Sequence, residues 1–238
     1  MKNNSDISVC GFKRIDENTK KVLSQEMRYE ERRIIEKDSN FEEVISVNTA
    51  LWNKLYKSSL LKEIKELENP PRILEDMIFL ARVYLKTEKI SFVSDYLYNY
   101  MVREGSAMNT LKNNDINLVQ SAMLQIKGEY LKNKNNQEKL EILSSMAFLH
   151  LGVSLMLLVS NSIKYNFRKE YKNNLKYLNN NFPQWKHTKY LKMIYCITHK
   201  SSNLKLAIVK KIYVFHMFGI FISIYKFITK TLKIDIKW

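Results

Sequence analysis

The sequence predicts an α/β fold, in which a small mixed portion of strands and helices is followed by a mostly helical extension. Strand-like and helix-like patterns mix within the first 105 residues, whereas only helical patterns follow Asn109. The 238 residues include only 5 Gly and 3 Pro, too few turn-forming residues for a many-stranded sandwich or barrel. Hydrophobic residues make up 45% of the chain and aromatic residues 12%, which excludes wholesale disorder.

The first predicted elements are a strand and a turn. Residues 7–12 alternate as a half-buried strand does, and residues 16–18 have the composition of a turn. Residues 26–40 are dense in charges of both signs and indicate a solvated helix or an excursion. Residues 48–61 return to an aromatic and aliphatic pattern, and a Pro-Pro pair at 70–71 then breaks the chain.

A helix buried on most sides is predicted at residues 75–86, because almost every position in it is apolar. Glu75 and Asp76 stand in its first turn. Residues 90–93 and 96–102 are rich in aromatic and β-branched side chains and predict two short strands.

Beyond the strands, the helical patterns cover residues 118–131, 138–165 and 167–178. Asn-rich hinges separate them, and no repeat period is found. We therefore expect a mixed α/β portion at residues 1–110 and a helical extension at 111–203. A basic amphipathic helix is expected at 204–238.

Residues 142–163 contain no charged side chain for 22 positions, which is long enough to cross a bilayer. Five serines, His150 and Asn161 lie within this run, and such a polar load favours a helix buried against protein. Whether this segment spans a membrane stays open. The N-terminus has no apolar stretch typical of a secretory signal, so we expect a cytoplasmic protein.

The net charge of +15 lies almost entirely in the last third of the chain. Residues 1–163 carry 23 Lys and Arg against 22 Asp and Glu, whereas residues 164–238 carry 16 against 2. Such a cluster attracts a nucleic acid or an anionic membrane equally well. Four lysines near the C-terminus share one helical face, at positions 226, 230, 233 and 237. That helix either lies at the membrane interface or docks on the core of the protein itself.

Three sets of segments, in this order and spacing, carry a resemblance to a known family. They are residues 4–12 with 16–18; residues 51–61, 75–79, 98–100 and 103–106; and residues 181–185 with 190–191. Together they resemble the second half of a family 2 glycosyltransferase of the GT-A type, of the sort that builds bacterial capsular, exopolysaccharide and lipopolysaccharide chains. The resemblance covers residues 4–110 well and 165–238 loosely.

The resemblance implies a partial GT-A domain, similar to nucleotide-diphospho-sugar transferases, that lacks its N-terminal nucleotide-binding half. A complete enzyme of this family holds a divalent metal, Mg or Mn, on an Asp-x-Asp segment. This chain contains no Asp-x-Asp segment and no other metal-ligand motif. We therefore expect either a truncated gene product or a split enzyme whose donor-binding half is a separate chain.

Inverting sugar transfer needs a base that removes the proton of an acceptor hydroxyl. The resemblance implies that Asp76 is this base and that Glu75 orients the acceptor. At the start of a helix the macrodipole favours the ionised form of both acids. An alternative is that both acids only cap the helix, because acids are common in first turns.

The predicted substrate-binding residues are Trp52, Asn53, Lys54 and Arg103. Arg103 precedes a Gly-Ser turn, from which a guanidinium can meet a diphosphate; an exposed salt bridge is the alternative. Trp52, Asn53 and Lys54 are expected in the wall of the acceptor site, since sugar faces stack on indole rings. A Trp at helical spacing from Tyr56 is more often a core residue.

Other chemistries find no support in the sequence. Cys10 and Cys196 are far apart, which excludes a disulfide framework or a cysteine zinc site. The four histidines have no metal-ligand spacing, and no Gly-rich phosphate loop occurs.

The leading hypothesis is a glycosyltransferase that moves a sugar from a nucleotide-sugar to a glycan or lipid-linked acceptor in cell-surface polysaccharide synthesis. It would be peripheral at the inner face of the cytoplasmic membrane, held there by its basic tail. The first alternative is a non-catalytic membrane-surface adaptor derived from such an enzyme. A nucleic-acid binder rests on charge alone, and we expect no nucleic-acid partner.

Overall fold

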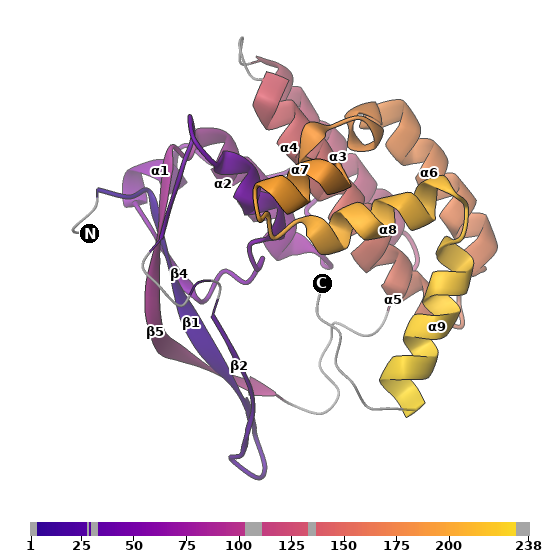
Figure 1. The fold of residues 1–238 in the computed structure, drawn as a ribbon, viewed down its shortest axis with the longest axis horizontal. Coiled ribbons are helices and arrows are strands. Elements are labelled where there is room, and N and C mark those ends of the chain that lie inside the picture. Colours follow the sequence, from indigo (N-terminus) through magenta and orange to yellow (C-terminus); the bar gives the residue numbers. More distant parts are fainter. Residues whose placement is uncertain (1–3, 28, 30–32, 103–110, 133–136, 232–238) are drawn as a thin grey trace. The chain divides into compact units, whose positions relative to one another are not determined.

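The computed structural model describes residues 4–27, 29, 33–102, 111–132 and 137–231. The chain forms two compact units. Unit 1 comprises Met1–Asn109 and Asn117–Ala122, and unit 2 comprises Thr110–Ile116 and Met123–Trp238. Unit 1 contains the sheet and unit 2 is helical among its described residues (Figure 1).

Unit 1 is built on a mixed sheet with the strand order β2-β1-β5-β3. Its strands are β1 (Ile7–Asp16), β2 (Val22–Glu26), β3 (Ile34–Glu36), β4 (Lys54–Tyr56) and β5 (Lys89–Val102). β1 and β5 are parallel, and the other pairs are antiparallel. β2 and β4 both pair with β1, β4 along its first residues and β2 along its last. The strand predicted at residues 7–12 is therefore confirmed.

The prediction of two strands at 90–93 and 96–102 is wrong, because β5 runs without a break from Lys89 to Val102. The ladder with β1 shifts register on both sides of Gly11, so β5 passes three unpaired residues, Ser94, Asp95 and Leu97, without ending. A Cβ on Gly11 would lie 3.1 Å from the ring of Tyr96, so the irregularity brings the two strands close together.

Residues 26–40 form no helix among their described positions, so the solvated-helix interpretation is wrong there. Ile34–Glu36 instead adds strand β3 to the free edge of β5, and Ile35 is fully buried. A 3-10 helix, η1 (Phe41–Ser46), follows. The charged composition of residues 26–40 did not predict β3, because only three residues, Ile34–Glu36, pair with the sheet.

The helix predicted at residues 75–86 is confirmed as α2 (Glu75–Lys86). A short helix, α1 (Ser58–Lys62), precedes it. Tyr84 of α2 packs edge-on against Phe41, and Phe79 packs edge-on against Tyr56 of β4. The helix thus buries one face on η1 and presents its first turn beside β4. The core of unit 1 includes Ile7, Val9, Ile35, Val44, Ile45, Leu80, Val83, Ile90 and Phe92.

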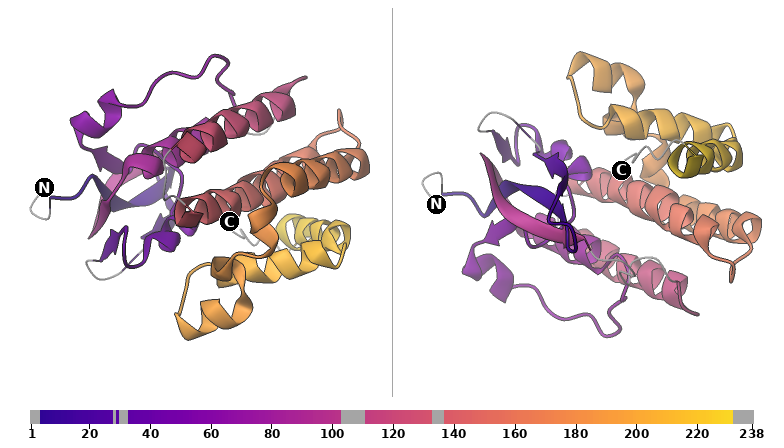
Figure 2. Two further views of the ribbon diagram at one scale, coloured as in Figure 1. Left: turned by 90° about the horizontal axis from the view of Figure 1, so that it is seen from above. Right: turned by 90° about the horizontal axis from the view of Figure 1, so that it is seen from below.

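The helices beyond the sheet follow the predicted patterns. α3 (Asp115–Lys132) has residues in both units. Those of unit 2 are α4 (Gln137–Ala147), α5 (Leu155–Asn161), α6 (Phe167–Asn181), α7 (Met193–Thr198), α8 (Leu204–Val214) and α9 (Phe218–Thr231). A π-helix, η3 (Phe148–Ser154), joins α4 to α5, and two 3-10 turns, η4 (Pro183–Lys186) and η5 (Lys189–Leu191), follow α6. Figure 2 shows α6 running alongside the continuous α4-η3-α5 helix.

This continuous helix, Gln137–Asn161, is the one helix of the described residues long and apolar enough to cross a membrane. Its most apolar stretch of 18 residues is 83% buried inside the protein, as expected for a core helix. Phe148 stacks face to face on Trp185, with ring centroids 4.6 Å apart. The widened backbone of η3 leaves carbonyl groups to other partners. Asn174 donates to the carbonyl of Leu151 at 2.8 Å, and Tyr213 donates to that of Gly152.

The single basic helix expected at 204–238 is wrong, because a turn at residues 215–217 separates α8 from α9. Phe218 and Ile222 of α9 are buried, and Lys226 donates to the carbonyl of Ser160. One face of α9 therefore packs on the other helices of unit 2. Residues 232–238, with two of the four lysines predicted to share a face, lie outside the described residues.

Candidate functional site

The candidate site lies in unit 1, where β4 and the first turn of α2 meet. Asn53 anchors the start of β4 to β1 by two hydrogen bonds: its side-chain amide donates to the carbonyl of Cys10, and its own carbonyl accepts from the Cys10 N–H, both at 3.0 Å. Lys54 is the first residue of β4 and pairs with Val9. This clamp fixes the direction in which the Lys54 side chain leaves the sheet.

Lys54 is a buried lysine, with only 6% of its surface exposed. Its ammonium donates to the carbonyls of Asn48, at 2.6 Å, and Ala50, and to the side-chain oxygen of Asn53 at 2.9 Å. Three acceptors match the three N–H groups of an ammonium. Burial nevertheless lowers the pKa of Lys54 to about 7, although the negative charge of Asp76 opposes this shift. The charge at this position therefore responds to pH in the neutral range.

Asp76 is half-buried in the first turn of α2, and Glu75 beside it is exposed. Burial raises the pKa of Asp76, and the like charge of Glu75 raises it further. The positive charge of Lys54 and a hydrogen bond from the backbone N–H of Leu51 act in the opposite direction. The net shift is upward, so this carboxylate holds a proton more tightly than an ordinary aspartate does.

The backbone that presents these acids is strained at one residue. Leu74, at the N-terminal boundary of α2, has φ 54° and ψ 22°, a left-handed conformation that costs a side chain other than Gly or Asn about 1–2 kcal/mol. Its carbonyl accepts from the N–H of Ile78 at 3.0 Å, so the strained residue still begins the helix. Strained backbone of this kind recurs at functional sites, where the surrounding fold maintains it.

Tyr56 is a further residue of the site that sequence reasoning did not select. Its hydroxyl is buried and has no hydrogen-bond partner among the described residues. Burial raises the pKa of Tyr56, and the charge of Asp76 adds to the rise, so the group stays a neutral donor. Its position was visible in the sequence: Tyr56 is two residues from Lys54, which places both side chains on one face of β4.

Trp52 belongs to an aromatic cluster on the sheet. Its ring stacks on Tyr98 and Tyr100 of β5, with centroids 4.5 and 5.0 Å apart, and Phe12 packs edge-on at 4.7 Å. Phe12 and Tyr98 are register partners across β1 and β5. The alternative that Trp52 is a packing residue is therefore supported, and its half-exposed ring leaves part of its surface open.

A cavity of about 570 Å³ adjoins the site at Glu75. Ile78, Phe79 and Arg82 of α2 form one wall with Glu75. The segment between α1 and α2 forms the other, through Ile64, Lys65, Glu66, Leu67, Glu68, Pro70 and Pro71. Arg82 is buried and donates to the carbonyl of Lys65, which holds the two walls together. A lining that is largely apolar with a few charged side chains is typical of a pocket for a small molecule.

The structure thus brings four of the six predicted site residues close to one another: Asp76, Glu75, Lys54 and Asn53. Trp52 lies in the adjacent aromatic cluster. Arg103 lies outside the described residues. A half-buried carboxylate with a raised pKa, beside a lysine that titrates near neutrality, can accept a proton from a substrate hydroxyl.

A divalent metal, which the sequence resemblance implies for a complete enzyme, finds no ligand set in the described part of the chain. No group of three His, Cys, Asp or Glu side chains there could hold a metal ion. In the acidic pair Glu75 and Asp76, Asp76 interacts with the positive charge of Lys54, which opposes the binding of a cation. We therefore derive no catalytic step through a metal on these residues.

In sequence and in fold, the chain resembles glycosyltransferases. A segment of 61 residues is 31% identical to the cholesterol galactosyltransferase of Borreliella burgdorferi and covers 26% of this chain and 17% of that enzyme. A segment of 59 residues is 48% identical to the poly(ribitol-phosphate) beta-glucosyltransferase of Bacillus spizizenii and covers 24% of this chain and 9% of that enzyme. No protein-family model matches the chain.

Among solved structures, the chain is similar to S. aureus TarS 1-349 in complex with UDP-GlcNAc. The TM-score is 0.57 at 21% sequence identity, and the match covers 89% of this chain and 60% of that chain. The likeness extends over both the sheet and the helices and shows an α/β fold shared with that protein. The chain thus matches less than two thirds of each of these proteins.

Proposed function

We propose that this chain is the acceptor-side part of a glycosyltransferase that moves a sugar from a nucleotide-sugar to an alcohol hydroxyl. The proposal is carried by one observation: the half-buried Asp76 has a raised pKa, accepts a hydrogen bond from the Leu51 N–H and interacts with the charge of Lys54, in a chain whose fold is similar to that of a glycosyltransferase. A GT-A domain of family 2 and a role in cell-surface or capsular polysaccharide synthesis are the finer form of the proposal.

In the proposed reaction, Asp76 takes the proton of the acceptor hydroxyl. The acceptor oxygen forms a new bond to the anomeric carbon of the sugar, and the bond from that carbon to the diphosphate oxygen breaks. The electron pair of the broken bond leaves with the nucleoside diphosphate. The raised pKa makes Asp76 a stronger base than an exposed aspartate. The charges of Lys54 and of the Leu51 N–H dipole keep it ionised and ready to act.

The acceptor and donor classes come from the relatives. The names of the two matching enzymes specify a sterol and a poly(ribitol-phosphate), which share an alcohol hydroxyl as the reacting group. TarS binds UDP-GlcNAc, and we propose a nucleotide-sugar of that kind as donor. The cavity at Glu75 would hold part of the acceptor, with Glu75 orienting it. Trp52, Asn53 and Lys54 remain proposed acceptor-wall residues, and Arg103 a proposed diphosphate contact.

The donor-binding half is proposed to come from outside these 238 residues, on a separate chain or a further segment. The divalent metal, Mg or Mn, would be held there, on an Asp-x-Asp segment of the kind absent from this sequence. We also propose that the protein works at the inner face of the cytoplasmic membrane, to which the positive charge of residues 164–238 would hold it.

The test reconstitutes the chain with an Asp-x-Asp-bearing partner and measures sugar transfer from UDP-sugars to a hydroxyl acceptor. Asp76→Asn should lower kcat by about 10²- to 10⁴-fold, because an amide cannot accept the proton. Exposed Asp95→Asn on β5 is the matched control and should retain activity. If Asp76 only caps α2, Asp76→Asn would leave kcat intact and cost at most about 1 kcal/mol of stability.

Glu75→Gln separates the two acids. Removing the like charge lowers the pKa of Asp76, so the acid limb of the kcat profile should move to lower pH. The KM for the acceptor should rise more than kcat falls, because Glu75 orients the substrate and does not take the proton. An unchanged acid limb in Glu75→Gln would contradict the assignment of Asp76 as the base. Inactivity of the reconstituted pair across all donor sugars would contradict the proposed function itself.

The second candidate function is a non-catalytic membrane-surface adaptor derived from such an enzyme. The observation that favours it is the concentration of 16 Lys and Arg against 2 acids in residues 164–238. It predicts binding to anionic vesicles with no affinity for any UDP-sugar, which equilibrium dialysis with a labelled UDP-sugar would measure.

A further inference from the structure

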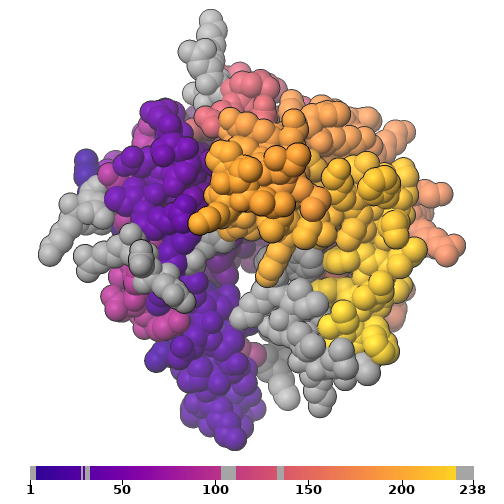
Figure 3. All heavy atoms as spheres, in the orientation of Figure 1, coloured from indigo at the N-terminus to yellow at the C-terminus, as the bar shows by residue number. Residues whose placement is uncertain are grey.

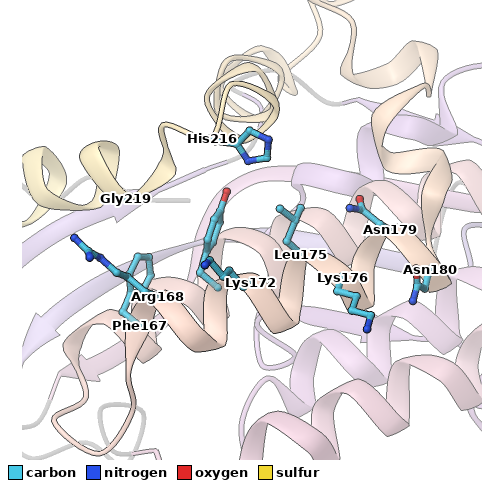
Figure 4. Close-up of a pocket in the computed structure, with 10 residues that line it drawn as sticks. Phe167, Arg168, Lys172, Leu175, Lys176, Asn179, Asn180, His216 and Gly219 are labelled. Atoms are coloured by element: carbon cyan, nitrogen blue, oxygen red, sulfur yellow. The ribbon is translucent and has the colours of Figure 1, made fainter.

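Unit 2 contains a cationic groove that the proposed reaction does not use. One cavity, of about 590 Å³, lies between α6 and the turn from α8 to α9. A second, of about 460 Å³, continues along α9 and shares Phe167, Arg168, His216 and Gly219 with the first. Because they share walls, the two cavities form one groove, which we call the α6–α9 groove. Figure 4 shows its α6 side and His216 opposite.

The wall of the groove on α6 is positively charged. Arg168, Lys172 and Lys176 follow one another at four-residue intervals, so they stand in a row along one face of the helix. None of the three forms an ion pair with another described residue, and all are exposed. Lys226 adds a fourth cation in the second cavity. Among the residues that the structure describes, no aspartate or glutamate lines either cavity, so the groove favours an anionic ligand.

The floor of the groove offers polar and aromatic groups. Phe167 and Tyr171 stack with ring centroids 6.0 Å apart, and Tyr171 also stacks on Phe218 at 5.7 Å. The Tyr171 hydroxyl and the side-chain oxygen of Asn179 are buried and have no hydrogen-bond partner among the described residues. Burial raises the pKa of Tyr171 to about 12, so its hydroxyl remains a donor at neutral pH. Such a donor beside a row of cations suits a phosphate oxygen.

An exposed apolar row borders this groove on α9. Ile220, Ile224 and Phe227 are exposed by 58, 54 and 63%, and their spacing of four and three residues places them on one face. Ile220 itself lines the second cavity. Isolated exposed apolar residues are common, but three in a row beside a cationic groove match an interfacial helix, with apolar and basic sides. In the space-filling view α9, in yellow, is exposed on the drawn face (Figure 3).

We propose that the α6–α9 groove binds the phosphate of an anionic lipid headgroup while Ile220, Ile224 and Phe227 enter the same leaflet. A bilayer presents a dense layer of phosphate directly next to hydrocarbon. The cationic groove would meet the phosphate, and the apolar row that adjoins it would meet the hydrocarbon. An acidic protein partner would supply the charge but not a continuous apolar phase. The inference specifies where unit 2 meets the membrane and does not depend on sugar transfer.

The test measures co-sedimentation of the full chain with vesicles at 0.1 M salt, without donor or acceptor. The unchanged protein should bind vesicles of phosphatidylcholine that contain about 30% phosphatidylglycerol, an anionic lipid. It should not bind vesicles of pure phosphatidylcholine. Each cation near an anionic surface contributes about fivefold. Arg168→Gln/Lys172→Gln/Lys176→Gln should therefore lower binding at least about tenfold.

A matched triple variant removes the same charge elsewhere on unit 2. Lys164, Lys169 and Lys205 are exposed and line neither cavity. Lys164→Gln/Lys169→Gln/Lys205→Gln should lose less than about threefold, since only diffuse attraction is weakened. Equal losses in the two triple variants would overturn the groove as the binding site. So would failure of the unchanged protein to bind anionic vesicles.

Two further arms separate a lipid from other occupants. Ile224→Ser/Phe227→Ser should weaken vesicle binding, whereas Ile194→Ser, at a 78% exposed position of α7, should not. If the double variant instead turned a dimer into a monomer and bound vesicles normally, the row would be a contact between copies and the proposal would fail.

Glycerol phosphate, titrated by NMR, should bind only weakly; binding as strong as to vesicles would assign the groove to a free phosphate ester. Loss of transferase activity in the reconstituted enzyme affects none of these outcomes.

Discussion

Asp76 and Lys54 each hold a charge that burial opposes, and each stabilises the charged form of the other. For both side chains, burial is the dominant cause of the pKa shift: upward for the acid and downward for the base. The pKa values of both groups are therefore shifted toward neutral pH relative to those of exposed side chains. Such mutual adjustment is frequent where a side chain must gain and lose a proton during a reaction.

The sequence allowed Asp76 to be selected only through the resemblance of its segment to glycosyltransferases. From the residues alone, an acid in a first helical turn indicates a cap as readily as a base. What distinguishes Asp76 is its contact with Leu51 and Lys54, some twenty residues earlier in the chain. Burial and charge at such a distance depend on how β4 meets α2, which local sequence does not specify.

His150 of unit 2 is a buried histidine whose lowered pKa makes the stability of the protein depend on pH. It is buried in η3, its Nε2 has no hydrogen-bond partner among the described residues, and burial lowers its pKa to about 4. In the unfolded chain the pKa is about 6.5. Between these values the unfolded state binds a proton that the folded state does not, so stability falls as pH drops through 6.5 toward 4.

We predict that His150→Leu removes this part of the acid sensitivity. Between pH 7.5 and pH 5, the free energy of unfolding of the unchanged protein should fall by about 2 kcal/mol more than that of the variant. Urea unfolding at the two pH values measures the difference. Parallel losses in both proteins would mean that His150 can bind a proton in the folded state.

The π-helix η3 is the element whose geometry depends most on its neighbours. Its carbonyls at Leu151 and Gly152 accept from Asn174 and Tyr213, on α6 and α8. Without these donors the widened turn would leave buried acceptors unpaired, which costs about 1–3 kcal/mol each. Sequence patterns predicted a continuous helix here but not its π turn, because the compensating donors lie 23 and 61 residues away.

Gly152→Ala should destabilise unit 2 by about 1–2 kcal/mol. A Cβ there would lie 2.9 Å from Cδ2 of Phe148, and the Phe148 ring is held against Trp185 and cannot turn away. Part of the cost is offset because alanine favours helix over glycine by about 1 kcal/mol. Denaturant unfolding of the full chain measures the change.

Gly128→Ala on α3 is the matched control for the glycine prediction. A Cβ at Gly128 would meet no atom within 4 Å, so the substitution should leave stability unchanged or raise it by up to about 1 kcal/mol. If both alanine variants were stabilised, Phe148 would have room to move, and the tight packing of η3 would be disproved.

The strands also show what a local pattern cannot decide. Two strands were predicted where β5 is one, since Ser94 and Asp95 interrupt the aromatic pattern. These two residues have no partner in the ladder with β1, and the pairing resumes beyond them at Tyr96. The helix at 75–86, by contrast, was predicted with its observed bounds because its apolar residues continue to its ends and an acidic pair begins it.

For the molecule as a whole, the uneven charge is the property with the widest consequences. Residues 1–163 are nearly neutral, whereas residues 164–238 carry an excess of 14 positive charges. Several of these lysines surround the α6–α9 groove, and others are spread over unit 2. Attraction of the whole charge is long-ranged and screened by salt, whereas apolar insertion is not.

Salt should therefore separate the two contributions. Raising salt from about 0.1 M to about 0.5 M shortens the Debye length from about 10 Å to about 4 Å, and binding to anionic vesicles should fall at least about tenfold. The binding that remains should be lost in Ile224→Ser/Phe227→Ser. Complete loss of binding of the unchanged protein at the higher salt would show that α9 contributes no apolar insertion.

The sequence by itself determined the fold class, the positions of the long helices, the helix that presents Glu75 and Asp76, and the asymmetry of charge. These follow from periodicity and composition, which are local properties of the chain. Only the tertiary structure decided that β5 is continuous, that Lys54 is buried beside Asp76, and that Arg168, Lys172 and Lys176 border a groove closed by the α8–α9 turn. Each of these depends on contacts between distant segments, where burial changes the free energy of a charge and no local pattern records it.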